Sequence, residues 1–182
     1  MSGRDPNGLK NEEELQSYFI RRIEKFVNKQ GRSIIGWDEI LEGGLAPNAA
    51  VMSWRGMNGG IAAARSGHEV VMSPTSHCYF DYDFSAIDSQ KAYGFDPVAG
   101  LSPDQAKLVL GLQANFWSHI DREPEKVDGQ LFPRLLSLAE RAWSNKDVKD
   151  WPTFKGRLNN HLLRLDSMGI KRHRDISVEE GT

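Results

Sequence analysis

The stretch Ser33-Ile34-Ile35-Gly36-Trp37 decides the fold, because it is a short apolar run, preceded by a glycine turn, that ends in a tryptophan. Ala50-Val51-Met52-Ser53-Trp54 repeats this design. Runs of this length between turn residues are typical of strands that are buried on both faces, as in a parallel sheet. We therefore expect strands over 33–37 and 50–54, each with a tryptophan at its carboxyl end.

Helical patterns alternate with these runs along the chain. Between 12 and 29, apolar residues recur every three or four positions with charges between them, which predicts an amphipathic helix that Gly31 ends. Other patterns predict strands over 69–72 and 109–116, a helical turn from Ser102, and helices over 61–66, 127–143 and 153–168. Alternation of helices with buried strands predicts an α/β fold with a parallel sheet.

About four parallel strands with helices are half of an eight-stranded α/β barrel, whose usual length begins at about 200 residues. We expect a single domain over 1–182, with flexible tails at 1–10 and 172–182. A half-barrel exposes two unpaired sheet edges. A homo-oligomer that pairs these edges is therefore a possible partner arrangement.

Two parts of the chain carry specific packing expectations. The stretch from Ser73 to Pro103 is too polar and too interrupted to predict core, and irregular segments of this length commonly carry function. Further on, a helical stripe should face the core: Leu131, Leu135, Leu138, Ala139 and Ala142. We expect Arg134 to form an ion pair with Glu140, and Trp143 and Trp151 to serve packing.

The composition indicates a globular domain and excludes several partners. With 39% apolar residues and a net charge of −2, the chain can bury a core, and we expect neither nucleic acid nor a membrane as a partner. Cys78 is the only cysteine, and no Cys and His set has ligand spacing, so we expect no metal and no cofactor. The N-terminus lacks the apolar segment of a signal peptide, so the chain as written is expected to be cytoplasmic or an incomplete part of a parent of unknown compartment.

Aromatic and acidic residues gather near the expected strand ends. Trp37, Trp54 and Trp117 each follow a strand candidate, and Tyr79 and Asp81 lie between the last two. An indole offers a broad apolar face for a pyranose ring or an acetamido methyl, with one N–H donor at its edge. In α/β barrels the carboxyl ends of the strands face the active site, which favours a sugar pocket over ordinary core packing.

Five motifs carry a resemblance to a known family: Gly36-Trp37-Asp38-Glu39, Met52-Ser53-Trp54-Arg55-Gly56, Tyr79-Phe80-Asp81, Gln113-Ala114-Asn115-Phe116-Trp117, and Leu131-Phe132-Pro133-Arg134-Leu135 with Leu138-Ala139-Glu140. In this order and spacing the chain resembles the glycoside hydrolase family 20 β-N-acetylhexosaminidases, from about Leu15 to Asp166. Each motif alone is weak evidence, whereas five in register are strong. The resemblance implies the C-terminal half of a (β/α)8 TIM barrel.

The resemblance also implies roles for the residues near the strand ends. Trp37, Trp54 and Trp117 look like the box around the 2-acetamido group of a terminal N-acetylhexosamine, so glycans that contain this sugar are the implied partners. Tyr79 looks like the catalytic phenol that donates to the acetamido oxygen, and Asp81 looks like a carboxylate that binds sugar hydroxyls. In that family the acetamido oxygen attacks the anomeric carbon, so the retaining mechanism needs no carboxylate nucleophile.

Two features depart from the family pattern. The family's adjacent Asp-Glu pair, which orients the acetamido N–H and protonates the leaving oxygen, has no counterpart, because no His-x-Gly-Gly-Asp-Glu-like sequence occurs here. His119 stands where many members have a glutamate that binds ring hydroxyls, so we expect an imidazole to bind substrate there. Asp38 and Glu39 cannot both enter the pocket from one strand, and Asp38 is expected to orient a neighbour or to cap.

Whether the chain is an enzyme by itself therefore stays open. The first hypothesis is a β-N-acetylhexosaminidase half-domain that supplies the acetamido-binding pocket. One alternative is a non-catalytic N-acetylhexosamine-binding module. Another is a structural half-barrel that self-associates and whose tryptophans only pack.

Overall fold

The computed structural model describes residues 8–117, 123–145, 147 and 150–179. They fall into two compact units. Unit 1 lies within Met1–Met72 and Val98–Gly111, and unit 2 lies within Ser73–Pro97 and Leu112–Thr182. The single domain over 1–182 stays a prediction.

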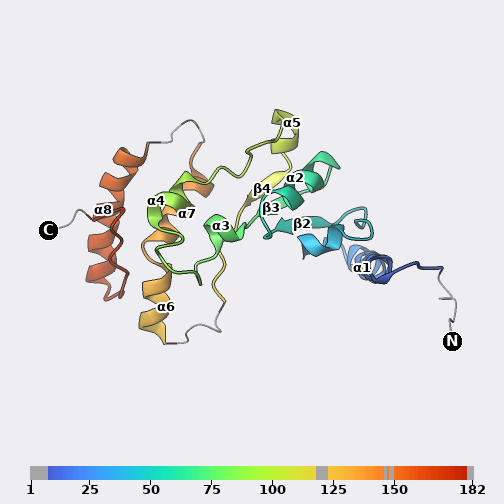
Figure 1. Ribbon diagram of the computed structural model, residues 1–182, viewed down its shortest axis with the longest axis horizontal. Coiled ribbons are helices and arrows are strands. Elements are labelled where there is room, and N and C mark those ends of the chain that lie inside the picture. The colour runs from blue at the N-terminus through green and yellow to red at the C-terminus, as the bar shows by residue number, and fades with distance from the viewer. Residues whose placement is uncertain (1–7, 118–122, 146, 148–149, 180–182) are drawn as a thin grey trace. The chain divides into compact units, whose positions relative to one another are not determined.

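A sheet with the strand order β1-β2-β3-β4 forms the centre of unit 1 (Figure 1). The strands are β1 (Ile35–Trp37), β2 (Ala50–Ser53), β3 (Val70–Met72) and β4 (Val109–Leu112). Trp37 pairs with Met52, and Ser53 pairs with Met72, so these parallel strands end at a common edge. The strands alternate with helices, which confirms the predicted α/β class.

The short strands are stable because an alanine-rich helix, α2 (Asn58–Arg65), covers them. Val51, Val70, Met72 and Ala63 are fully buried at this contact. Burying a valine or methionine side chain contributes roughly 1.5–3 kcal/mol. A Cβ on Gly60 would lie 2.7 Å from the end of the Met72 side chain, so glycine is what permits this close approach.

The first helix, α1, has the predicted bounds Glu12–Lys29. The Asn11 side chain caps it by accepting from the Glu14 N–H at 3.0 Å, and Gly31 follows it with a positive φ of 68°. The remaining helices of unit 1 are the 3-10 helix η1 (Asp38–Leu41) and α5 (Pro103–Ala106). A capping box between Ser102 and Gln105 starts α5, as the sequence predicts.

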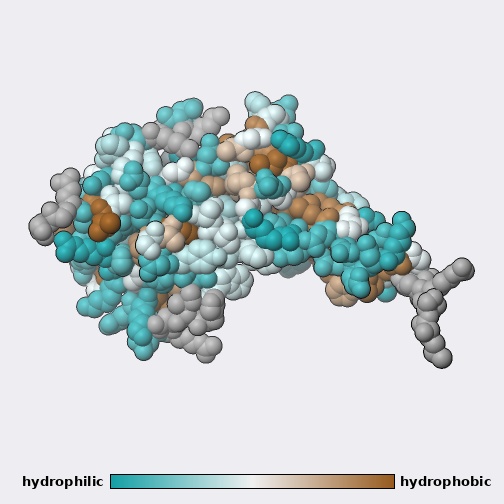
Figure 2. All heavy atoms as spheres, viewed as in Figure 1, coloured by the Kyte–Doolittle hydropathy of each residue, from teal (hydrophilic) through white to brown (hydrophobic). Residues whose placement is uncertain are grey.

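The apolar face of α1 points away from the sheet. Its buried residues are polar: Ser17 donates to the Gly44 carbonyl, and Glu24 accepts from the Asn48 N–H. The apolar side chains that line the opposite face are 41–66% exposed: Leu15, Phe19, Ile23 and Phe26. In Figure 2, brown atoms reach the surface among teal ones where Figure 1 places α1. An amphipathic pattern thus predicted the helix but not which face is covered.

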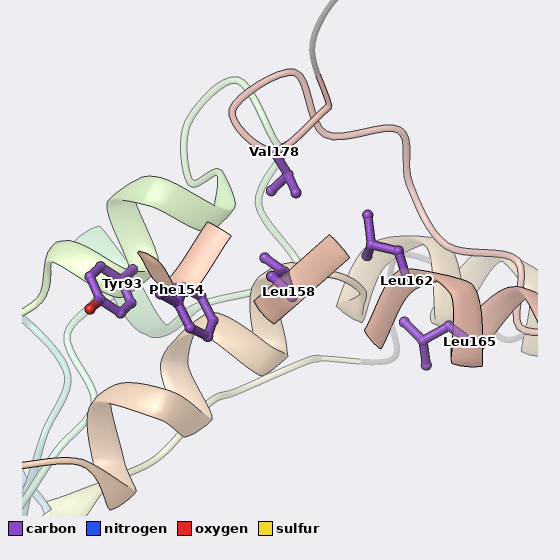
Figure 3. Packing of buried hydrophobic residues seen from close by; sticks show 6 residues of the cluster. All are labelled: Tyr93, Phe154, Leu158, Leu162, Leu165 and Val178. Carbon is purple, nitrogen blue, oxygen red and sulfur yellow. The ribbon is translucent and has the colours of Figure 1, made fainter. Parts of the chain in front are cut away.

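Unit 2 is mainly helical (Figure 1). Its helices are α3 (Thr75–Cys78), α4 (Ser89–Gly94), α6 (Pro124–Leu131), α7 (Arg134–Trp143) and α8 (Trp151–Ser167). Four residues of α8 pack with Tyr93 and Val178 in one buried cluster: Phe154, Leu158, Leu162 and Leu165 (Figure 3). The Tyr93 and Phe154 rings stack at 4.7 Å, which joins α4 to α8.

The segment 73–97 corrects one expectation, because it supplies core rather than an open loop. Cys78, Phe80, Ile87 and Ala92 are at most 1% exposed. In this segment polar residues, whose side chains bond to the backbone, stand between the apolar residues. The apolar residues therefore follow neither a helical nor a strand period, and the sequence pattern does not predict their burial.

The expected helix over 127–143 is also wrong as one element, because Pro133 divides it into α6 and α7. Proline has no N–H and restricts the preceding residue, and Phe132 is accordingly extended with φ −101° and ψ 141°. The expected stripe is confirmed in α7 at Leu138, which is 3% exposed, and wrong at Ala139 and Ala142, because the other buried residues of this helix are Arg134, Ser137 and Arg141. Ala139 and Ala142 are exposed.

Three smaller expectations are corrected in unit 2. Trp143 is 91% exposed, whereas Trp151 packs against the α8 cluster as expected. Glu140 forms its ion pair with Arg157 instead of Arg134. From residue 172 to 179 the chain packs rather than trailing as a flexible tail, since Val178 is 1% exposed and Asp175 accepts from the Ser89 N–H at 2.8 Å.

None of the helices that the structure describes is long and apolar enough to cross a bilayer.

Candidate functional site

Two of the expected pocket tryptophans lie at neighbouring strand ends in unit 1. Trp37 is the last residue of β1, and Trp54 directly follows β2. Both side chains are half-buried. The strand register thus places these two indoles at the edge where α/β barrels carry their chemistry.

Asp38 organises the turn that carries Trp54. The strand has ended at Trp37, and the buried Asp38 carboxylate accepts from the Trp54 N–H at 3.2 Å and the Arg55 Nε–H at 2.7 Å. A Cβ on Gly59 would come within 2.8 Å of this carboxylate, so α2 begins close against it. Asp38 therefore orients its neighbours, as the sequence predicts.

Glu39 holds the edge of the Trp54 indole. Its two carboxylate oxygens lie 3.0 and 3.1 Å from Trp54 Nε1, which donates to them. Arg55 lies between Glu42 and Asp38, and the hydrogen bonds that it donates to these two carboxylates raise its pKa above the usual value. The orientation of the indole is thus fixed at its polar edge and by the backbone of the same turn.

Tyr79 and Asn115 form a parallel bridge in unit 2. The Phe80 N–H donates to the Asn115 carbonyl at 2.7 Å, and the Asn115 N–H donates to the Cys78 carbonyl at 2.8 Å. The Asn115 amide also donates to Ser73 Oγ and accepts from the Gln113 amide. This network fixes the backbone at Tyr79. The strand predicted over 109–116 is therefore too long, because β4 ends at Leu112 and only the isolated bridge at Asn115 follows it.

Asp81 is 8% exposed, and its Oδ1 has no hydrogen-bond partner within the described residues. A buried carboxylate oxygen without a partner costs free energy, and a ligand hydroxyl would supply the missing donor. Tyr79, two residues earlier, is 6% exposed, and its ring centroid lies 6.1 Å from that of Tyr82. Asp81 therefore has the features of a group that binds hydroxyls.

The predicted site residues divide between the two units. Trp37 and Trp54 belong to unit 1, and Tyr79, Asp81 and Trp117 belong to unit 2. Trp117 is 44% exposed. His119 lies outside the described residues. The convergence of the three indoles into one box stays a prediction.

Other reactive side chains in this part of the chain have no features of a catalytic centre. Burial raises the pKa of the Cys78 thiol to about 12, so it is protonated at neutral pH. Burial, and then Lys91, lower the pKa of His77 below its usual 6.5, and its ring stacks on Phe95 at 5.0 Å. Among the residues with described positions, no three His, Cys, Asp or Glu are grouped to hold a metal ion.

Sequence reasoning missed the contact of Glu39 with Trp54 and the burial of Arg134, which is 0% exposed. A glutamate two residues after a strand-end tryptophan is a weak signal, because such a side chain is usually solvated. Arg134 sits in a helix where a charge normally marks the exposed face. Glu39 bonds to the predicted site residue Trp54, whereas Arg134 bonds to the carbonyls of Phe80 and Tyr82, which flank Asp81.

Comparison with known proteins gives consistent matches. Residues 3–146 match the family model described as glycosyl hydrolase family 20, catalytic domain. A beta-hexosaminidase of Porphyromonas gingivalis is 45% identical, over 96% of this chain and 24% of the relative. A beta-N-acetylhexosaminidase of Cellulomonas fimi is 30% identical, over 84% of this chain and 34% of the relative.

A solved structure supports the same relationship. The GH20 exo beta-N-acetylglucosaminidase from Vibrio harveyi, in complex with N-acetylglucosamine, matches with a TM-score of 0.83 and 30% identity. The match covers 92% of this chain and 29% of that chain. Four parallel strands with helices agree with the predicted partial barrel. This chain thus spans about a quarter to a third of the length of the proteins that it matches.

Proposed function

This chain belongs to glycosyl hydrolase family 20, and we propose from this premise that it supplies the acetamido-binding half of a β-N-acetylhexosaminidase active site. The ligand is a terminal N-acetylhexosamine of a glycan. Trp37, Trp54 and Trp117 enclose its acetamido group, and His119 contributes to ring recognition. Tyr79 and Asp81 supply the polar contacts.

The observation that carries this proposal is the buried Asp81, two residues from Tyr79, whose Oδ1 has no hydrogen-bond partner in the part of the chain that the structure describes. Leaving a buried polar group unsatisfied costs about 1–3 kcal/mol. A sugar hydroxyl that donates to Oδ1 removes this cost on binding. The orientation of the Trp54 indole by Asp38 and Glu39 gives independent support, because a pre-oriented wall loses little freedom when a ligand binds.

The chemistry in the complete enzyme is substrate-assisted. Tyr79 donates a hydrogen bond from its phenolic O–H to the acetamido oxygen and aims that oxygen at the anomeric carbon. The oxygen attacks as the glycosidic bond breaks, and the leaving oxygen takes a proton from a general acid. No carboxylate of this chain is needed as a nucleophile.

The general acid comes from outside this sequence. Asp38 and Glu39 are the acidic pair nearest the strand ends, but Asp38 is occupied by Arg55 and the Trp54 backbone, and Glu39 by the Trp54 indole. A general acid contributes on the order of a hundred- to ten-thousandfold in rate. The chain alone is therefore expected to bind the sugar without cleaving it efficiently.

The test is calorimetric titration of the 182-residue chain with GlcNAc-thiazoline, whose fused ring imitates the cyclised acetamido group. Binding should be saturable, should not occur with glucose, and should weaken in Trp54→Phe. Trp143→Phe is the matched control, because Trp143 is 91% exposed. A folded chain that binds neither GlcNAc-thiazoline nor N-acetylglucosamine refutes the proposal. Turnover of p-nitrophenyl-GlcNAc only after addition of the other barrel half separates a half-enzyme from a non-catalytic binding module.

Self-association is the second candidate. We propose a second copy of the chain as the occupant of the sheet edges, because the two edge strands expose apolar residues: Ile35 of β1 is 47% exposed and Leu110 of β4 is 59% exposed. Exposed apolar edges favour pairing with another strand. Light scattering should give the mass of a dimer, and a monomer across the micromolar range overturns this candidate.

A further inference from the structure

Arg134 is a fully buried guanidinium in unit 2. It is the first residue of α7, and each of its four hydrogen bonds ends on a backbone carbonyl. Nε donates to Gln130 at 2.9 Å and Nη1 donates to Ile87 at 2.8 Å, while Nη2 donates to both Phe80 and Tyr82, at 2.6 and 2.8 Å.

The two carbonyls bound by Nη2 flank Asp81. They belong to the peptide units that follow Phe80 and Tyr82, so one nitrogen holds the backbone on both sides of the Asp81 side chain. Gln130 adds weaker contacts, since its amide nitrogen lies 3.3 Å from the carbonyls of Asp81 and of Tyr82. Three consecutive carbonyls thus accept from two side chains at the junction of α6 and α7.

Aromatic rings complete the enclosure of the guanidinium. Its Cζ lies 4.0 Å from the centre of the Phe84 ring and 4.9 Å from that of Phe80. Burial lowers the pKa of Arg134 to about 10, and the nearby carboxylates of Asp175, Asp83 and Asp81 oppose this effect.

Burying a cation costs desolvation free energy that an apolar side chain of the same volume does not. Apolar residues of similar volume commonly replace buried charges without loss of stability, so a buried arginine indicates a need for geometry rather than for stability. The planar guanidinium offers five N–H donors in a fixed fork, which suits several carbonyls in different directions. A lysine ammonium has three donors on one atom and cannot reach the same set.

We propose that Arg134, assisted by Gln130, is the positioning residue that sets the direction of the Asp81 carboxylate and the Tyr79 phenol toward the sugar. This inference rests on the proposed function for the identity of the ligand. Arg134 acts through the backbone of residues 79–82 and does not touch the substrate. It converts the helix junction into a rigid support for the polar half of the pocket.

The test compares Arg134→Lys with Arg141→Lys in the full chain. Arg141 is the matched control because it is also a buried arginine of α7, but its Nε donates to the Phe95 carbonyl, away from residues 79–82. Residue-resolved hydrogen exchange should show the Phe80 and Tyr82 amides exchanging at least tenfold faster in Arg134→Lys than in Arg141→Lys. Affinity for GlcNAc-thiazoline should fall at least tenfold in Arg134→Lys and less than twofold in Arg141→Lys.

Gln130→Met provides a second variant, since Gln130 is only half-buried and its replacement leaves the core filled. It should weaken GlcNAc-thiazoline binding about threefold, whereas Gln90→Met at an exposed position should leave it unchanged. If Arg134→Lys does not fold, the Gln130→Met result decides. Equal exchange at Phe80 and Tyr82 in the two arginine variants, or unchanged affinity in Arg134→Lys or Gln130→Met, overturns the proposal. If the wild-type chain binds no sugar, the proposed function fails, and the exchange comparison alone decides the role of Arg134.

Discussion

Replacement of Glu39 by methionine should release the edge of the Trp54 indole while keeping the volume of the side chain. The two Glu39 oxygens, at 3.0 and 3.1 Å from Trp54 Nε1, share one hydrogen and therefore count as a single charge-assisted bond. Such bonds contribute about 1.5–3 kcal/mol. Because the Trp54 indole is half-buried, water can accept from its N–H in the variant and restore part of this free energy. We expect the free energy of unfolding to fall by about 1–1.5 kcal/mol, which corresponds to a drop of about 2–6 °C in Tm.

The assay is thermal unfolding together with affinity for GlcNAc-thiazoline. Because a tenfold change in affinity corresponds to about 1.4 kcal/mol, a ligand that needs the fixed indole should bind three- to tenfold more weakly to Glu39→Met. Glu39→Gln keeps an acceptor oxygen and is the matched control, with less than half of either effect. Unchanged Tm and affinity in Glu39→Met would refute the reasoning that Glu39 orients the pocket wall.

Three further predictions concern unit 2. Leu158→Ala empties a site that is 0% exposed and should cost about 2–5 kcal/mol in urea unfolding, whereas Leu163→Ala, at 69% exposed, should cost less than about 0.5; equal costs would contradict the described core. Because burial lowers the pKa of His77, the unfolded chain binds more protons than the folded chain once the pH falls below the unfolded pKa of about 6.5, so stability is lost from that pH downward. Urea unfolding of His77→Gln at several pH values should show a weaker dependence of stability on pH. An unchanged dependence would contradict the burial of His77. Cys78, whose thiol pKa is about 12, should react with Ellman's reagent at neutral pH only after denaturation, and rapid labelling of the native chain would disprove its burial.

The strands and their tryptophans could be predicted from local sequence. Ile35 to Trp37 and Ala50 to Ser53 lie in short apolar runs with a sharp turn nearby, and that pattern depends little on the rest of the fold. The bounds of α1 were predictable for the same reason, since the Asn11 cap and Gly31 are local signals. Family resemblance then assigned Trp37 and Trp54 to a site.

Burial depends on partners far along the chain, and there the sequence was a poorer guide. The apolar stripe of α1 is exposed, because polar Ser17 and Glu24 satisfy the backbone of the 44–48 turn. In α7 the buried positions include Arg134 and Arg141, whose donors satisfy carbonyls that no periodic pattern reveals. Periodicity therefore predicts the fold class, but it does not predict the buried polar side chains that hold the backbone near the site.

The contact of Glu39 with Trp54 shows the same limit. Strand alternation predicted that Asp38 and Glu39 point to opposite faces, but the strand ends at Trp37 and a 3-10 helix follows. Both carboxylates consequently bond to the next strand's turn. A change of backbone conformation over one residue reversed the inference about where Glu39 points.

The most direct test of the central claim is an NMR titration that follows the indole N–H signals, assigned by single Trp→Phe variants, as N-acetylglucosamine is added to the chain. The account predicts saturable shifts for Trp37, Trp54 and Trp117, with the exposed Trp143 unchanged and glucose without effect. Shifts confined to Trp143, or no shift of the three pocket indoles at saturating sugar, would contradict it.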